Sequence, residues 1–270
     1  MNGAFDRAWN WESSRGAPAS KWIIVLTSAA FVLQLLLARN RAVGAFLGYL
    51  VLHGDGLRAG MVWQPVSYML LHGGVGHLLM NMLGLAFLGP EVERRLGTPH
   101  FLTLYVASGV LGGLGFVLLD PHAMCVGASG GVFGVMAAFA TLFPHRRMAL
   151  ALFPFFTLPA WKMVSAIVGI ELLYLVQGGS SGGIAHSAHL AGGLAGVVYA
   201  RVAGRGGMTA PFAPGIRRRI GEWITPEAGR PVDAAEVDRL LDKVASQGLG
   251  ALTPAERRRI EQASRERRGA

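Results

Sequence analysis

The sequence repeats apolar runs long enough to cross a membrane, and this constrains its fold more than any other feature. A membrane-spanning helix needs about 20 mainly apolar residues. Only 15% of the 270 residues are charged, against about a quarter in soluble domains. We therefore predict an all-α polytopic membrane protein with six transmembrane helices. The predicted spans are residues 22–38, 76–92, 99–119, 126–143, 161–177 and 185–203.

One further apolar run, residues 43–52, is too short to be a span. Ten helical residues extend about 15 Å, half of a hydrocarbon core of about 30 Å. We interpret this run as a re-entrant or interfacial segment inside a long first loop that ends near Val75.

The basic residues predict the orientation, because cytoplasmic loops carry an excess of Lys and Arg. With the N-terminus inside, the outer loops after the third and fifth spans contain no Lys or Arg, and only Arg39, Arg41 and Arg58 of the first loop dilute the pattern. We expect an integral protein of a bacterial-type cell (inner) membrane, with N-terminus and C-terminus cytoplasmic. The inner loops carry Arg94, Arg95, Arg146, Arg147 and Lys162.

The same distribution accounts for the net charge of +9, so we expect no nucleic-acid partner. Residues 1–20 lack the apolar core of a cleavable signal peptide. Cys125 is the only cysteine, which excludes an intramolecular disulfide and gives no sign of a thiolate metal cluster.

Four regions follow from these patterns. We predict a cytoplasmic N-terminal tail at 1–20, a membrane domain at 21–205, a basic Pro/Gly linker at 206–230 and a small cytoplasmic helical hairpin at 231–270. In the hairpin, helix-start signals occur at Asp233 with Glu236 and at Thr253 with Glu256. An apolar face follows the first of them, formed by Val237, Leu240, Leu241 and Val244.

Ser129 lies in a glycine-rich stretch at 126–134, directly before an apolar run. Glycines such as Gly127 and Gly130 allow a sharp turn and a close backbone approach. The first turn of a helix also presents unpaired N–H groups that suit a developing negative charge. Ser129 could therefore combine a nucleophile with an oxyanion site. The stretch alone would equally suit a small-residue packing face between membrane helices.

Other polar residues fall at a similar depth in the outer half of the membrane. His77 and Asn81 share one face of the second span, and His189 begins the sixth. Gly192 and Gly196 follow His189 at helical spacing and would give the sixth span a flat face for the glycines of the fourth. Singly, each histidine could be structural and Asn81 could bridge two helices. Together they supply the nucleophile, base and oxyanion donors of serine catalysis.

These residues resemble the rhomboid family of intramembrane serine proteases, over roughly residues 63–199. The motifs that carry the resemblance are Gly-Ala-Ser-Gly at 127–130, Phe133, His77-x-x-x-Asn81, Ala188-His189 followed by Gly192 and Gly196, and Leu88-Gly89 leading to Glu93-Arg94-Arg95-Leu96-Gly97. The family usually has Trp-Arg where this chain has Trp63-Gln64, which puts first-loop contacts in question but not the catalytic residues.

The resemblance implies a six-helix rhomboid-type bundle in which Ser129 is the nucleophile and His189 the base of a Ser-His dyad. His77 and Asn81 would serve the oxyanion, and Phe133 would pack beside the base. The supporting glycines would be Gly127, Gly130, Gly192 and Gly196.

The remaining titratable residues are predicted to lie outside catalysis. Glu171, inside the fifth span, could contact a partner helix or line a water-filled space. His186 stands one turn from His189 and is the least clear of the loop and span-end histidines. We expect no metal and no cofactor. The other histidines of this group are His53, His72, His100, His122 and His145.

The predicted function is endoproteolysis of transmembrane segments, with transmembrane protein substrates and the lipid bilayer as partners. A non-catalytic rhomboid-like protein that binds membrane helices for quality control is the alternative. A small transporter would show paired repeats with interrupted helices, which this sequence lacks.

Overall fold

The computed structural model describes residues 17–37, 40–150, 153–178, 185–204 and 234–247, together with Leu252, Thr253, Glu256, Ile260 and Ala263. The chain divides into two compact units, Met1–Ala213 and Pro214–Ala270.

Each of the six predicted spans contains one helix among its described residues. Among the described residues, α2, α6 and α7 are long and apolar enough to cross a membrane, whereas α8 is apolar but has only 14 residues. The helices are α2 (Pro18–Leu37), α6 (Val75–Leu96), α7 (Thr98–Leu119), α8 (Ser129–Leu142), α9 (Ala160–Val176) and α10 (His186–Ala203).

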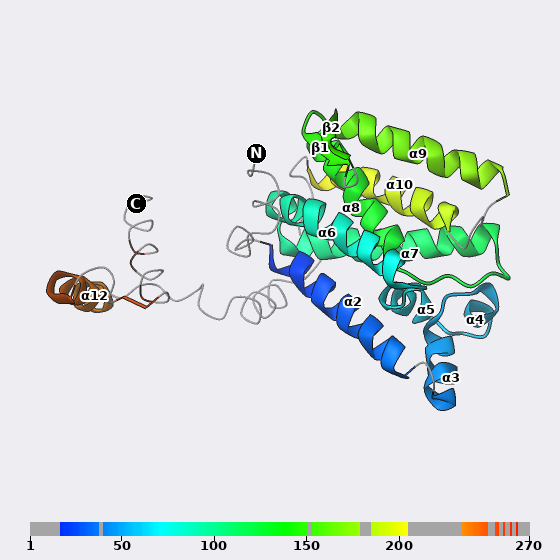
Figure 1. The fold of residues 1–270 in the computed structure, drawn as a ribbon, viewed down its shortest axis with the longest axis horizontal. Coiled ribbons are helices and arrows are strands. Elements are labelled where there is room, and N and C mark those ends of the chain that lie inside the picture. Colours follow the sequence, from blue (N-terminus) through cyan, green and yellow to red (C-terminus); the bar gives the residue numbers. More distant parts are fainter. Residues whose placement is uncertain are drawn as a thin grey trace. The chain divides into compact units, whose positions relative to one another are not determined.

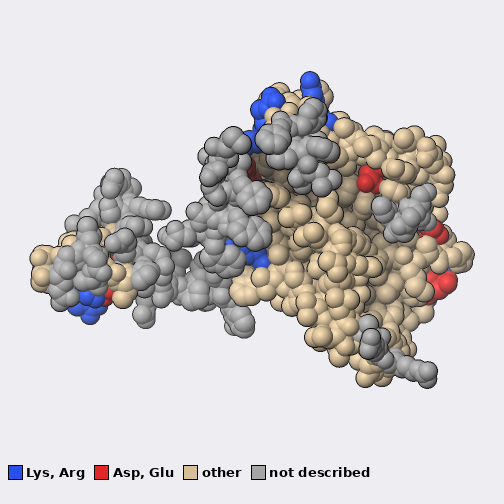
Figure 2. All heavy atoms as spheres, viewed as in Figure 1, with Lys and Arg blue, Asp and Glu red and all other residues tan. Residues whose placement is uncertain are grey.

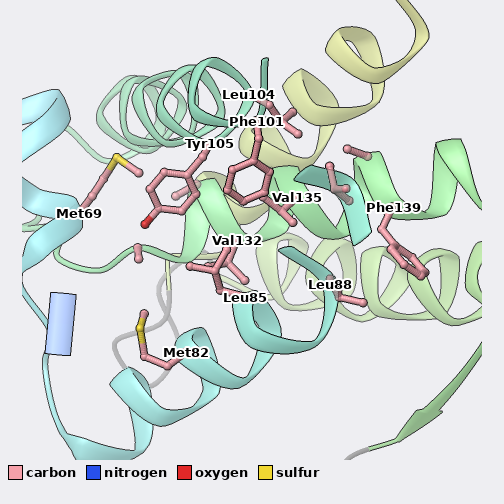
Figure 3. Close-up of a cluster of buried hydrophobic side chains, with 14 of the residues drawn as sticks. Met69, Met82, Leu85, Leu88, Phe101, Leu104, Tyr105, Val132, Val135 and Phe139 are labelled. Carbon is pink, nitrogen blue, oxygen red and sulfur yellow. The ribbon is translucent and has the colours of Figure 1, made fainter. Parts of the chain in front are cut away.

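Helix α8 is the centre of the bundle and packs against α6, α7 and α10. Helices α2 and α9 lie on opposite sides, α2 against α6 and α9 against α10 (Figure 1). Between α6, α7 and α8 lies a cluster of buried apolar side chains (Figure 3). It includes Leu85 and Leu88 of α6, Phe101, Leu104 and Tyr105 of α7, and Val132, Val135 and Phe139 of α8.

The first loop folds into short helices that anchor the approach to α8. These are α3 (Arg41–Leu50), α4 (Gly54–Arg58), α5 (Gln64–Ser67) and η1 (Tyr68–Leu70). Leu52 and Cys125 exchange two backbone hydrogen bonds of 3.1 and 2.8 Å, and the Gly127 N–H donates to the Tyr68 carbonyl at 3.0 Å. The loop thus holds the backbone that leads into Ser129.

Gln64, at the position where the motif departs from the usual arginine, is fully buried in this loop. Its Oε1 accepts from the His53 N–H at 3.3 Å, and its Nε2 donates to the Tyr49 carbonyl at 3.4 Å. The neighbouring Trp63 donates to the same Tyr49 carbonyl at 2.8 Å. The uncharged amide of Gln64 therefore links the backbone at Tyr49 and His53 to the start of α5.

A short antiparallel pair of strands between α8 and α9 corrects the all-α prediction. Strand β1 (Arg147–Leu150) pairs with β2 (Phe153–Pro159), with Arg147 opposite Pro159 and Ala149 opposite Thr157. Pro144 follows the end of α8, and the aromatic and β-branched residues of Phe-Pro-Phe-Phe-Thr favour an extended backbone. No strand was predicted from the sequence in this connection.

Near the C-terminal end of α6, Glu93 fixes the start of α2. Glu93, fully buried, accepts hydrogen bonds from the backbone N–H groups of Ala19 and Ser20 at 2.9 and 2.8 Å. The hydroxyls of Ser20 and Thr98 each donate to it at 2.7 Å. One carboxylate thereby caps the first turn of α2 and ties that helix to α6 and α7.

Charged side chains occupy the two ends of this first unit. On the face shown in Figure 2, Lys and Arg gather near β1 and β2, whereas Asp and Glu lie toward the end that carries α4. Uncharged side chains cover most of the broad band between them, which carries one acidic patch in this view. This is the surface expected of a bundle surrounded by lipid.

In the second unit, α12 (Ala234–Gln247) buries Val237 and Leu240 but leaves Leu241 48% exposed. The second predicted helix-start signal is present as reciprocal hydrogen bonds between Thr253 and Glu256. Asp233, part of the first signal, lies outside the described residues.

Candidate active site

Ser129 is the first residue of α8 and is partly exposed. The chain reaches it through Gly127, whose φ of +126° is one that side-chain-bearing residues rarely adopt. A Cβ at Gly127 would also overlap the His77 ring, 2.5 Å from its Cε1. Glycine is therefore required here both for the turn and for the approach of His77.

The start of α8 also presents backbone donors. Its first helical hydrogen bond runs from the Val132 N–H to the Ala128 carbonyl at 3.0 Å. The N–H groups of Ser129, Gly130 and Gly131 precede that bond, so the helix itself gives them no acceptor. They can serve an anion beside Ser129.

His189 lies in the first turn of α10 and is 8% exposed. Its ring stacks on Phe133 of α8, with centroids 4.1 Å apart and an interplanar angle of 11°. Phe133 stands one turn after Ser129, so the structure brings the serine turn of α8 and the histidine of α10 to the same place.

Glycine makes that approach possible. A Cβ at Gly192 would collide with the backbone of Gly130, and one at Gly196 with the backbone of Gly134. The expected glycine contact between these two helices is present. A larger residue at either site would separate α8 from α10.

Asn81 lies one turn beyond His77 on α6 and is buried. Its Nδ2 donates to the His77 carbonyl at 2.9 Å. This bond uses one of the two amide hydrogens and leaves the second for another acceptor.

His72, placed outside catalysis by the sequence, lies beside the site. Its Nε2 is 3.5 Å from the Ala128 nitrogen, and its ring centroid is 5.0 Å from that of His77. Burial, with a smaller contribution from His77, lowers the pKa of His72 to about 4, so the ring is neutral at pH 7. A neutral Nε2 can accept the backbone N–H that precedes the serine.

Cys125 is four residues from Ser129 and would be the obvious competing nucleophile. It is buried, and burial raises the pKa of its thiol to about 12. Because the thiolate is the reactive form, this cysteine is inert at neutral pH.

Glu171 is the residue whose role the sequence left undecided. Its Oε2 lies 2.6 Å from Nδ1 of His186 and 3.0 Å from Nδ1 of His189. A signal for this cluster existed, since all three residues lie within two turns of the connection between α9 and α10. Neighbouring antiparallel helices bring residues at equal distance from their connection to the same depth.

Comparison with known proteins identifies two matching families. The model of the Rhomboid domain matches residues 59–206, and that of a family of unknown function (DUF6576) matches residues 229–266.

Curated relatives share the first of these regions. RHOMBOID-like protein 12, mitochondrial, of Arabidopsis thaliana is 30% identical over 168 residues, 55% of this chain and 48% of that protein. Rhomboid protein 1, mitochondrial, of Saccharomyces cerevisiae is 34% identical over 130 residues, 46% and 36% of the two chains. Rhomboid protease GluP of Bacillus subtilis is 31% identical over 142 residues, 52% and 26%. The chain thus spans less than half the length of each of these relatives.

Proposed function

The chain belongs to the rhomboid family and is an integral membrane protein, and on that premise we propose that it hydrolyses peptide bonds in or near transmembrane helices of other membrane proteins. Ser129 is the nucleophile and His189 the general base. The observation that carries this proposal is the stacking of His189 on Phe133, one turn from Ser129.

In this mechanism the Ser129 hydroxyl attacks the scissile carbonyl carbon and transfers its proton to His189. The new O–C bond leaves a negative charge on the former carbonyl oxygen. Collapse of this intermediate breaks the C–N bond, and His189 returns the proton to the leaving amine. Water then hydrolyses the acyl-serine by the same steps.

The oxyanion would be held by backbone N–H groups at the start of α8, with His77 and Asn81 beside them. The contact of His77 with Gly127 supports this assignment. Donors fixed in a poorly solvated site stabilise the intermediate more than the substrate.

The length of α8 supports a site below the membrane surface. Its 14 residues make a helix about 21 Å long, roughly 9 Å less than a hydrocarbon core of about 30 Å. If its C-terminal end lies at the inner boundary, Ser129 stands within the outer half of the membrane. Substrates must then unwind locally, because a helix hides its carbonyl groups in hydrogen bonds.

We further propose that all six apolar helices cross the membrane with both termini in the cytoplasm, which for residues 231–270 means a cytoplasmic helical hairpin. The gathering of Lys and Arg near β1 and β2 supports this orientation (Figure 2). A bacterial-type cell membrane is the proposed location.

Cleavage of a type I membrane substrate in liposomes, with the cut mapped by mass spectrometry, tests the proposed function. Ser129→Ala and His189→Ala should each reduce cleavage to background while the protein still inserts and unfolds at the same temperature. Near-normal turnover by Ser129→Ala would rule out the serine mechanism. Failure of the wild type both to cleave and to react with a fluorophosphonate would favour the non-catalytic alternative.

A further inference from the structure

The buried cluster of Glu171, His186 and His189 is more elaborate than a dyad requires. All three residues are at most 9% exposed. One carboxylate oxygen of Glu171 approaches the Nδ1 atoms of both histidines. The ring of His186 is in turn stacked on Tyr174, with centroids 5.1 Å apart.

A buried carboxylate inside an apolar helix is costly unless it is paired. Within α9, Glu171 and Lys162 are the only charged residues. The His186 contact of 2.6 Å alone would satisfy one lone pair of the carboxylate. The second contact, to His189, reaches the residue that the proposed mechanism uses as its base.

Three such ligands could also surround a metal ion, since their donor atoms lie within 4.8 Å of one another. Two ligands of one tetrahedral zinc, each about 2.0–2.1 Å from the ion, stand roughly 3.3 Å apart. The separations of 2.6 and 3.0 Å are shorter. Both distances are in the range of N–H donation to a carboxylate, and the His186 contact is a hydrogen bond.

We propose that Glu171 is a positioning residue for His189, which makes the catalytic arrangement of this chain a carboxylate–histidine–serine relay rather than a bare dyad. The inference rests on the proposed function. An ionised carboxylate can only accept hydrogen bonds, so it holds the proton of His189 on Nδ1 and leaves Nε2 free to take the proton of Ser129. It also lies beside the positive charge that His189 gains in the transition state.

The Nδ1 atom of His189 is within reach of the carboxylate but is not aligned with it as a hydrogen bond in this structure. Catalytic hydrogen bonds are often loose without substrate and tighten when it binds. His186 holds the carboxylate in place meanwhile, through the shorter of the two contacts. We expect a rotation of the His189 ring on substrate binding to align Nδ1 with the carboxylate and complete the relay.

Two substitutions separate the charge of Glu171 from its hydrogen bond. Glu171→Gln keeps an acceptor oxygen but loses the charge, and Glu171→Leu loses both at similar volume. Lys162→Gln, a charge-to-amide change on the same helix away from the cluster, is the matched control. We expect kcat per folded protein to fall about tenfold in Glu171→Gln and about 10²-fold in Glu171→Leu, with KM little changed and Lys162→Gln like the wild type.

The rate of fluorophosphonate labelling of Ser129 should fall in the same order, because it depends on the base and not on substrate binding. These assays use wild type and Ser129→Ala as references. If the wild type does not cleave, the proposed function itself has failed. If it cleaves and Ser129→Ala does not, the Glu171 variants report on the positioning role alone.

Three results would overturn this role for Glu171. In the first, the Glu171 variants lose thermal stability but keep the kcat of the folded fraction. In the second, Glu171→Leu turns over as fast as the wild type or faster. In the third, a chelator abolishes wild-type cleavage and zinc restores it, which would make the cluster a metal centre.

Discussion

Two buried carboxylates, Glu93 and Glu171, lie at different places in the bundle and have hydrogen-bonding partners of different kinds. Glu93 accepts four hydrogen bonds, two of them from backbone N–H groups that open α2. Glu171 contacts two imidazole rings, which share one of its oxygens. Glu93 joins α6 to α2, which is distant in sequence. Glu171 joins α9 to α10, the next helix along the chain.

The two sites differ in whether their hydrogen-bond donors can gain or lose a proton. A backbone N–H cannot lose its proton at neutral pH, so the partners of Glu93 hold one state and serve the fold. An imidazole can gain or lose a proton near neutral pH, so the partners of Glu171 can take part in proton transfer. Polar groups near Ser129 should therefore control turnover, and those around Glu93 should control stability.

Asn81 gives the largest of the effects expected from this contrast. Asn81→Ala should lower kcat by about 10²–10³-fold, or roughly 3–4 kcal/mol, because one oxyanion donor is lost. KM should change little, and weak activity should survive since the backbone donors of α8 remain. Steady-state cleavage in detergent, with thermal unfolding of the same preparation, measures both quantities.

The bond from Asn81 to the His77 carbonyl gives this residue a structural role as well. If Asn81 had only this structural role, activity and thermal stability would fall together in Asn81→Ala. Asn81→Asp is the companion variant, because it keeps the shape but offers no amide donor when ionised. A stable Asn81→Ala enzyme with full turnover would remove Asn81 from the oxyanion site.

Glu93→Gln should show the opposite behaviour. An amide nitrogen cannot accept, so at least one backbone N–H of the first turn of α2 loses its partner. A buried unsatisfied donor costs about 1–3 kcal/mol, and we expect the free energy of unfolding to fall by that amount. The kcat of the folded fraction should not change.

Glu91→Gln is the matched control, two residues earlier on the same helix. Glu91 pairs with Arg146 at 3.0 Å, and the Arg146 side chain is 62% exposed. Such a surface pair is worth about 0–1 kcal/mol, so Glu91→Gln should be nearly neutral. Equal destabilisation by the two variants, or a loss of kcat in Glu93→Gln, would erase the contrast between the two carboxylates.

The sequence predicted the helices well because each signal was local. An apolar run between basic or Pro-containing breaks identifies a helix without any knowledge of its neighbours, as with α7 between Gly97 and Asp120. The shared depth of Ser129, His77 and His189 followed from counting residues along such helices. Their roles remain predictions that the cleavage experiments test.

The sequence did not predict which side chains make contact between neighbouring helices. The sequence placed Glu93 in a motif at the end of the second span and Glu171 inside the fifth, but it named a partner for neither. The structure gives Glu93 the backbone of Ala19 and brings Glu171 to His189. Gln64 is similar, because only its burial shows that an amide fits the loop. Such pairings depend on helix rotation and loop paths, which residue spacing does not determine.

Glu256, in the second unit, is a partly exposed counterpart of both carboxylates and gives the smallest effect. The Thr253 backbone N–H, the Lys243 ammonium and the Thr253 hydroxyl hydrogen-bond to it and lower its pKa to about 2. A carboxyl whose pKa is lower in the folded state adds stability that is complete above its ordinary pKa of 4.5. That stability is lost as the pH falls toward about 2.

Thr253→Ala should therefore speed amide exchange in the segment 234–263 about two- to tenfold at pH 7, as expected for a lost helix cap. Lowering the pH from 4.5 toward 2 should shrink the difference between variant and wild type, because Glu256 becomes protonated as the pH approaches its folded pKa of about 2 and then accepts those bonds more weakly. Ser246→Ala is the control, since that hydroxyl bonds only to carbonyls of its own helix among the described residues. Hydrogen exchange read by mass spectrometry on the full chain, corrected for the intrinsic pH dependence of exchange, makes the comparison. A Thr253→Ala effect that persists undiminished at pH 2 would show that the carboxylate of Glu256 does not stabilise this turn.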